Sequence, residues 1–372
     1  MGKSKLDLLL YTPRFARITT TRNVHRHICG RLFSTAKSIT SPLRILFAGS
    51  DDFSSTSLKA LHREHECNPS LISSIDVLCR EDGRVGRNRD KLKEVPIKSI
   101  ARDLDLPLHT INTFKTWQSP STPFDLIIAV SFGLFIPASL IESFPYGGLN
   151  VHPSLLPRYR GAAPIQRTLL NHDRETGVTI QTLDKKRFDH GAILMQTSPP
   201  LPVPEDTSYR ALHDSLAEHG AEMLVETLRR GLFIPPLSPV ITTHAASLAP
   251  KVTTEDEHIV WGQWSARELQ LRVEMLGSVW TELGEEADTH DAPRKRAILT
   301  GIRVLDWEPE LDIGVGCFRY VKRKSPWEEL MVLRCRDGWV SVGAVKVEGK
   351  AAIEGGTWIR SLQKRGVGRK FW

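Results

Sequence analysis

Apolar residues in the first two thirds of the chain form short continuous runs, separated by longer stretches in which they recur every three or four residues. The runs predict buried strands and the longer stretches predict amphipathic helices. Their alternation indicates a parallel sheet built from βα units. The predicted strands cover residues 43–48, 71–78, 125–130, 148–152, 178–183 and 192–196. The predicted helices cover residues 52–66, 163–170 and 208–230.

The pattern changes after residue 230. Gly231 and the prolines at 235, 236 and 239 end the last long helix and open a linker, because proline cannot continue a helix. A helix over residues 265–276 follows, and after it come short β segments. These segments are residues 297–299, 302–305, 330–335 and 339–347, with Asp337-Gly338 as a turn before the last.

These changes predict four parts of the chain, and 372 residues are enough for two separate cores. The parts are a leader (1–41), an α/β domain (42–238), a linker (239–258) and a β-rich domain (259–372). We predict a Rossmann-like fold for the α/β domain. No G-x-G-x-x-G follows its first strand, so we do not predict a bound dinucleotide.

The basic net charge of +7 comes from the leader. Residues 1–41 hold eight Lys or Arg and one acidic residue. The whole chain has 50 Lys or Arg and 43 Asp or Glu, so the rest of the chain has equal numbers of basic and acidic residues. A segment rich in Arg, Ser and Thr and nearly free of acids is typical of an organellar transit peptide. Arg31 to Ser34 resembles a mitochondrial processing site with cleavage after Phe33. The alternative is a disordered basic arm that binds RNA or nothing.

Cysteine spacing favours neither a disulfide framework nor a zinc finger. None of the five cysteines forms a C-x-x-C pair. His62, His65 and Cys67 come nearest to a ligand cluster, but they fall on a polar helix end where solvated side chains are expected. We predict no metal. No apolar run approaches the roughly 20 residues that span a bilayer.

The candidate chemistry begins in the strand over residues 148–152. Alternate side chains of a strand share a face, so Asn150 and His152 point the same way while Val151 points into the core. An amide beside an imidazole can polarise a carbonyl and manage a proton while a nucleophile attacks. A structural role also remains open, with Asn150 closing a turn and His152 satisfying a buried backbone group.

The segment that continues from this strand resembles the signature of formyltransferases that use 10-formyltetrahydrofolate. The matching residues are Asn150, His152, Ser154, Leu155, Leu156 and Pro157. Those enzymes carry a third residue, an Asp shortly before a Gly, and Asp189 with Gly191 matches it. Further stretches are similar to the branch of the family that acts on methionyl-tRNA. They are residues 46–53, 131–137, 154–166 and 175–180.

The resemblance implies a role for each of these residues. Asn150 and His152 would hold the oxyanion of the tetrahedral intermediate, and Asp189 would orient His152 or a bridging water for proton transfer. The folate ring would lie along the strand that ends at Val130 and the turn that follows, although these residues would belong to the core in any α/β protein. The implied folate-binding residues are Ile128, Ala129, Val130, Phe132, Gly133, Leu134, Ser154, Leu155, Leu156 and Pro157.

A charged loop over residues 80–93 holds six basic residues. Such loops are usually solvated surface. In the resembling branch an insertion here enters the tRNA acceptor arm, and Arg87 matches its main arginine. Guanidinium groups suit phosphates and stacked bases. The tRNA-binding residues that the resemblance implies are Arg84, Arg87, Arg89, Lys91 and Lys350.

Together these features predict a Rossmann-like formyltransferase domain followed by a small OB-like β-barrel domain that binds tRNA. The expected reaction is formyl transfer from 10-formyltetrahydrofolate to methionyl initiator tRNA in the mitochondrial matrix, by a monomer that needs no metal. One alternative is a formyltransferase or formyl hydrolase that acts on a small-molecule amine. Another is a catalytically dead relative that binds folate or RNA.

Overall fold

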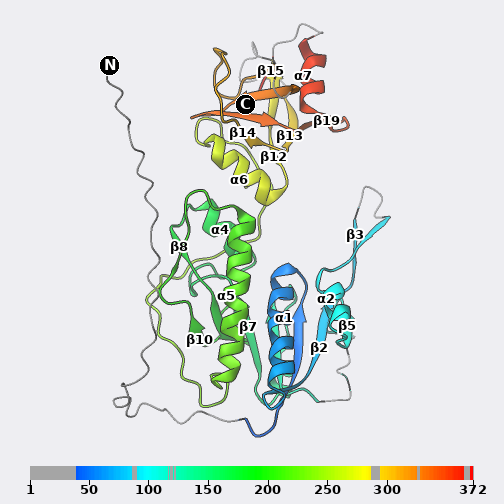
Figure 1. Cartoon of the computed structure of the whole chain (residues 1–372), viewed down its shortest axis with the longest axis vertical. Coiled ribbons are helices and arrows are strands. Elements are labelled where there is room, and N and C mark those ends of the chain that lie inside the picture. Colours follow the sequence, from blue (N-terminus) through cyan, green and yellow to red (C-terminus); the bar gives the residue numbers. More distant parts are fainter. Residues whose placement is uncertain are drawn as a thin grey trace, which may run out of the picture. The chain divides into compact units, whose positions relative to one another are not determined.

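A computed structural model of the chain shows its secondary structure (Figure 1). The structure describes residues 39–85, 90–115, 117, 120, 123–285, 294–324, 327–363 and 369–371. Almost all of the predicted leader lies outside the described residues, and so do Arg87 and Arg89.

A seven-stranded sheet forms the centre of the N-terminal half, in the order β10-β9-β7-β6-β1-β2-β5. The five strands from β7 to β5 are parallel. Strand β9 pairs antiparallel with β7, and β10 pairs antiparallel with β9. The bounds are β1 (Leu43–Gly49), β2 (Ile72–Arg80), β5 (Leu108–Ile111), β6 (Leu126–Val130), β7 (Gly148–His152), β9 (Thr179–Thr182) and β10 (Ile193–Gln196). The prediction of a Rossmann-like α/β fold is confirmed. Of these strands, β5 alone was not predicted.

Both faces of the sheet are buried. In β1, Ile45 and Phe47 belong to the core on one face, whereas Leu46 and Ala48 belong to the core on the other. This arrangement explains why the strands read as continuous apolar runs rather than alternating ones. The helices of this half are α1 (Asp52–Cys67), α2 (Ile97–Asp103), α3 (Ala138–Ser143), α4 (Pro164–Leu170) and α5 (Tyr209–Arg229).

Helices α1 and α5 lie side by side on one face of the sheet (Figure 1). The carboxylate of Asp51 accepts a hydrogen bond from the main-chain N–H of Ser54 and so caps the start of α1. Glu64 near the end of α1 is buried and pairs with Arg229 at the end of α5, with 3.0 Å between Oε1 and Nε. This ion pair fixes one helix against the other where both reach the edge of the apolar core.

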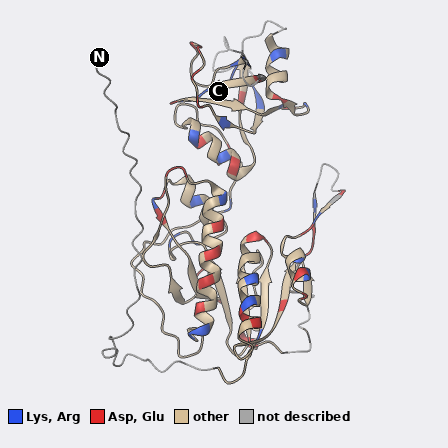
Figure 2. Ribbon diagram, in the orientation of Figure 1, with Lys and Arg blue, Asp and Glu red and all other residues tan. Residues whose placement is uncertain are grey.

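The charged loop over residues 80–93 contains a hairpin that stands apart from the main sheet (Figure 1). Its strands are β3 (Gly83–Val85) and β4 (Lys91–Lys93), paired antiparallel with Arg84 opposite Leu92. Basic residues lie on both strands (Figure 2). A second short pair, β8 (Glu175–Thr176) and β11 (Leu201–Pro202), lies elsewhere in this half.

The C-terminal half has a core of its own and consists of α6 (Ala266–Leu276), α7 (Gly355–Gln363) and two antiparallel sheets. One sheet has the order β19-β18-β13-β12-β20 and the other β14-β17-β16-β15. The predicted β-rich region is therefore present. Its strands are β12 (Val279–Glu285), β13 (Lys295–Thr300), β14 (Arg303–Val304), β15 (Phe318–Lys324), β16 (Trp327–Arg334), β17 (Trp339–Val342), β18 (Ala344–Val347), β19 (Ile353–Glu354) and β20 (Arg369–Phe371).

The run over residues 339–347, predicted as one strand, is two strands in different sheets. The chain crosses from one sheet to the other at Gly343, whose N–H donates to the main-chain oxygens of Thr300 and Gly301. Strands β12 and β15 were not predicted at all, because charged and polar residues interrupt their apolar positions.

Over the described ranges, no helix is long and apolar enough to cross a membrane. In that same part of the chain, no group of three or more His, Cys, Asp or Glu is arranged to hold a metal ion. His65, predicted to be a solvated side chain, is half-buried, and its Nδ1 lies 2.8 Å from the main-chain oxygen of Ile72.

Candidate active site

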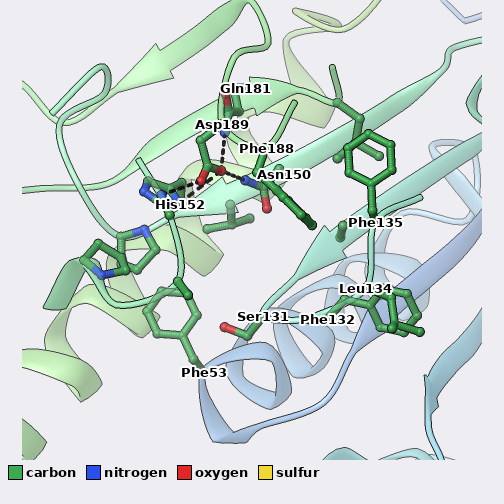
Figure 3. Close-up of a pocket in the computed structure, with 18 of the residues that line it drawn as sticks. Phe53, Ser131, Phe132, Leu134, Phe135, Asn150, His152, Gln181, Phe188 and Asp189 are labelled. Atoms are coloured by element: carbon green, nitrogen blue, oxygen red, sulfur yellow. Dashed lines mark hydrogen bonds and ion pairs between the residues drawn. The ribbon is translucent and has the colours of Figure 1, made fainter. Parts of the chain in front are cut away.

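A cavity of about 480 Å³ opens at the carboxyl ends of β6 and β7. This edge is where parallel α/β sheets commonly bind ligands, because the loops that leave neighbouring strands diverge there. The turn after β6 forms one wall, β7 supplies Asn150 and His152, and the loop between β9 and β10 supplies Asp189. Figure 3 shows these side chains grouped on one side of the cavity, with Ser131 and Phe53 across from them.

The structure brings the three predicted catalytic residues together. Asp189 Oδ1 accepts a hydrogen bond from Asn150 Nδ2 at 3.2 Å and lies 3.4 Å from Nδ1 of His152. His152 is buried, and Val151 between the two strand residues is in the core, as the alternation predicts. An amide nitrogen carries two hydrogens, so Asn150 keeps one for a ligand while it donates the other to Asp189.

Asp189 is placed by an unusual backbone. Its φ is +56°, a left-handed value that is uncommon for residues other than glycine. Gly191 follows, and a Cβ there would lie 1.7 Å from the main-chain oxygen of Thr182. The Asp-x-Gly pattern therefore has a steric reason, because only glycine lets this loop approach β9 closely enough to bring Asp189 to the cavity.

Gln181 is a site residue that sequence reasoning missed. It is 1% exposed on β9, donates from Nε2 to Asp189 Oδ1 at 3.1 Å, and accepts from the N–H of Gly191 at 3.2 Å. The available signal was a Gln in a strand otherwise expected to be buried, since a buried amide must find partners.

The tautomer of His152 follows from the hydrogen bond that its other ring nitrogen, Nε2, makes. Nε2 lies 2.8 Å from the main-chain oxygen of Tyr159. A carbonyl oxygen can only accept, so Nε2 carries a hydrogen. In the neutral ring Nδ1 is then the basic nitrogen, and it faces Asp189. The site thus offers a proton acceptor backed by a carboxylate, beside an amide donor.

The predicted folate-binding residues divide into two groups. Ala129, Phe132, Gly133 and Leu134 line the cavity. The others do not line it in the structure: Ile128, Val130, Ser154, Leu155 and Leu156 are buried in the protein, and Pro157 lies in the loop behind His152. Successive residues of β6 face opposite sides of the sheet, which separates Ala129 from its two neighbours.

Several other residues that line the cavity were not predicted as site residues. Phe135 and Phe188 meet edge to face at 5.1 Å between ring centroids and remain 39% and 58% exposed (Figure 3). Across the cavity lie Asp51, Tyr209 and His213. Burial, and then the negative charge of Asp51, raises the pKa of the Tyr209 phenol above its ordinary value, so that this phenol stays neutral at physiological pH.

The residues predicted to bind tRNA are far less fully described. Arg84 is exposed on β3, and Lys350 is exposed in the turn after β18. Lys91 belongs to β4, but its side chain is outside the described part of the structure, and Arg87 and Arg89 lie wholly outside it.

Comparison with known proteins identifies the class to which this fold and site belong. Residues 43–228 match the formyl transferase family model, a range that contains the seven-stranded sheet and the cavity. The mitochondrial methionyl-tRNA formyltransferase of Saccharomyces cerevisiae is 36% identical over 95% of this chain and 97% of its own length. The chain therefore belongs to the formyl transferase family, in its methionyl-tRNA formyltransferase branch.

Other similar proteins carry the name methionyl-tRNA formyltransferase as well. The human mitochondrial methionyl-tRNA formyltransferase is 30% identical over 82% of this chain and 75% of its own length. The bacterial enzyme of Marinobacter nauticus is 34% identical over 66% of this chain and 77% of its own. Among solved structures, HypX from Aquifex aeolicus in complex with tetrahydrofolic acid superposes with a TM-score of 0.52 at 17% identity. That match covers 88% of this chain and 48% of HypX, and it shows a shared fold.

Proposed function

We propose that this enzyme transfers the formyl group of 10-formyltetrahydrofolate to the amino group of methionyl initiator tRNA, in the mitochondrial matrix. The main support for this proposal is that Asn150, His152 and Asp189 lie together at one cavity. The chain also belongs to the methionyl-tRNA formyltransferase branch. The names of the yeast and human relatives supply the tRNA substrate and the compartment.

In this reaction the amino nitrogen attacks the formyl carbon, and the bond from that carbon to the folate nitrogen N10 breaks. The remaining N–H of Asn150 donates to the oxygen that becomes negative in the tetrahedral intermediate, and such a donor typically contributes about 10²–10³ in turnover. Nδ1 of His152 takes the proton from the attacking amine and returns it to N10 as that nitrogen leaves. Asp189, 3.4 Å away, stabilises the imidazolium in between.

The cavity suits a folate. A volume of about 480 Å³ falls within the usual range of small-molecule sites. The end of β6 and the turn after it offer main-chain groups at Gly133 and apolar side chains at Ala129 and Leu134, which fit a flat heterocycle with polar edges. We place the pterin ring there and the aromatic pair Phe135 and Phe188 beside the rest of the molecule.

The tRNA would be held by basic groups outside the cavity. We propose that the hairpin β3-β4, with Arg84, Arg87, Arg89 and Lys91, contacts the acceptor arm, and that Lys350 belongs to a second contact in an OB-like C-terminal domain. Phosphate contacts of this kind need a local basic patch rather than a basic protein. The proposed organisation is a transit peptide (1–41), a catalytic domain (42–238), a linker (239–258) and a tRNA-binding domain (259–372), in a monomer.

The test is a formylation assay of the protein without residues 1–33, beside the variant His152→Ala. The substrates are charged initiator tRNA, charged elongator methionine tRNA and free methionine, each with 10-formyltetrahydrofolate. Formylation of the initiator alone, lost in the variant, supports the proposal. Folate turnover without tRNA would assign a small-molecule substrate instead, and folate binding without turnover would identify an inactive relative.

A further inference from the structure

We propose that Ser247, in the segment between the two cores, is a positioning residue for His152. Its hydroxyl holds the main chain at Tyr159, and the carbonyl of Tyr159 sets the tautomer and orientation of the imidazole. The predicted effect on kcat rests on the proposed function. The predicted effect on the orientation and tautomer of His152 does not depend on it.

The link from Ser247 to His152 consists of two hydrogen bonds through one residue. Ser247 Oγ accepts from the main-chain N–H of Tyr159 at 2.9 Å, and the main-chain oxygen of Tyr159 accepts from His152 Nε2 at 2.8 Å. Tyr159 has a φ of +60°, a conformation that costs an ordinary residue roughly 1–2 kcal/mol. Such a backbone persists only where its surroundings hold it, and Ser247 supplies the partner of its N–H.

The side chain of Tyr159 is anchored as well, which limits how the residue can move. Its hydroxyl donates to Asp173 Oδ2 at 2.6 Å and accepts from Asn171 Nδ2 at 2.8 Å. The ring is therefore fixed at its far end. Rotation of the Tyr159–Arg160 peptide about this anchor is the movement that would carry the carbonyl away from His152, and the bond from Ser247 opposes it.

Ser247 belongs to a short strap, residues 247–249, that runs along the catalytic loop at residues 157–161. The N–H of Ser247 donates to the oxygen of Pro157 at 3.2 Å, and its own oxygen accepts from the N–H of Arg160 at 2.9 Å. The N–H of Ala249 donates to the oxygen of Arg160 at 2.7 Å. These main-chain bonds form an isolated bridge between Arg160 and Leu248, so the strap follows the loop like an added strand.

The same loop also holds Asp189. The N–H of Gly161 donates to Asp189 Oδ2 at 2.8 Å, and Arg160 Nε donates to the main-chain oxygen of Asp189 at 2.8 Å. Gly161 has a φ of +126°, and a Cβ there would lie 2.6 Å from the oxygen of Ala249. The loop therefore contacts the strap on one side and both ionisable catalytic residues on the other.

Because of this arrangement, we expect removal of the Ser247 hydroxyl to lower turnover more than it lowers the stability of the fold. Losing a single partly buried hydrogen bond lowers the folding free energy only modestly. A small displacement of a catalytic group, in contrast, can lower turnover by as much as 10²-fold. The described hydrogen bonds of Ser247 go to Pro157, Tyr159 and Arg160, which are not among the residues that line the cavity. Its loss is therefore expected to change kcat and leave substrate binding alone.

The first experiment compares Ser247→Ala with Ser247→Thr, which keeps the hydroxyl, and with Leu248→Ala, whose side chain is 74% exposed on the same strap. We expect kcat of Ser247→Ala to fall about tenfold or more, with KM for both substrates within about twofold of wild type. Ser247→Thr should recover most of the loss, and Leu248→Ala should behave as wild type. Equal kcat for wild type and Ser247→Ala would overturn the proposal, and so would a matching loss in Ser247→Thr.

A second readout needs no activity. In protein labelled with ¹⁵N-histidine, the ring of His152, identified by its absence in His152→Gln, should show one neutral tautomer with the hydrogen on Nε2. Ser247→Ala should show a mixture of tautomers or an exchange-broadened signal. An unchanged Nε2 tautomer in Ser247→Ala contradicts the inference. If the wild type forms no formyl-tRNA while the tautomer still responds to Ser247, the proposed function fails and the positioning role of Ser247 stands.

Discussion

Nδ1 of His152 faces Oδ1 of Asp189 at 3.4 Å, and the carboxylate is held in that position by three N–H groups from separate parts of the chain. Two are side-chain amides, from Asn150 and Gln181, and the third is the main chain of Gly161. All three donate, so both oxygens of the carboxylate act as acceptors. These hydrogen bonds fix the carboxylate beside the imidazole, where it can stabilise the imidazolium of the proposed reaction.

Asp189→Asn should remove this charge with little change of shape. We expect kcat to fall by about 10²–10⁴, because the imidazolium loses its counter-charge, while KM for the folate changes much less. Steady-state kinetics of formyl transfer measure both quantities. Asp103→Asn, an exposed residue at the end of α2, is the matched control, and a normal kcat in Asp189→Asn would remove the carboxylate from the mechanism.

Gly191→Ala should disrupt the loop that carries Asp189. The new methyl group would lie 1.7 Å from the oxygen of Thr182, so the loop has to move and Asp189 moves with it. Formylation should be lost and the melting temperature lowered. Gly83→Ala in the hairpin, where a Cβ meets nothing within 4 Å, should leave both unchanged. Full activity in Gly191→Ala would show that the cavity tolerates a shifted carboxylate.

The ion pair between Glu64 and Arg229 should make stability depend on pH. Hydrogen bonding to Arg229 lowers the pKa of Glu64 below its ordinary value of 4.5. A folded pKa below the unfolded one stabilises the protein above the unfolded value, and that stability is lost as the pH falls through the folded value. The unfolding free energy of the wild type should therefore decrease on acidification below about pH 4.5.

Arg229→Met tests the same pair, since among the described residues it leaves Asn68 as the remaining hydrogen-bond donor to the buried carboxylate of Glu64. We expect a loss of about 1–3 kcal/mol at neutral pH, measured by urea unfolding. The difference from wild type should narrow at pH 4, where protonation relieves the unpaired charge. The double variant Glu64→Gln with Arg229→Met should recover part of the loss, and a difference that grows on acidification would refute this account.

Arg84→Ala should weaken tRNA binding without affecting the chemistry. Removing one phosphate contact lowers affinity uniformly and reduces the slope of log affinity against log salt by about 1. KM for charged tRNA should therefore rise while KM for the folate stays constant. The control is Lys59→Ala, which removes an exposed basic residue of α1. A tRNA affinity and salt slope equal to those of the wild type would exclude the hairpin residue Arg84 as a contact.

Much of the first half of the fold could be predicted, because its strands are buried on both faces and are marked by continuous apolar runs such as Leu126–Val130. The C-terminal half was harder. Residues 339–347 have one continuous pattern of apolar residues but form two strands. The break at Gly343 arises because β17 pairs in one sheet and β18 in the other, which the local sequence does not show. Strand β15 ends in three consecutive basic residues, so its own pattern does not mark a strand, and its pairing with β16 makes it one.

The sequence alone was enough to suggest the chemistry of the site. Asn150, His152 and Asp189 match the signature of a formyltransferase, and the period of a strand places the first two on one face. How these side chains are held could be seen only in the folded protein. The tautomer of His152 depends on a main-chain oxygen at Tyr159, and the position of Asp189 depends in part on a main-chain N–H at Gly161. Every residue except proline carries both groups, so no residue type marks them in advance, and only the folded path of the chain brings Ser247 to the loop that presents them.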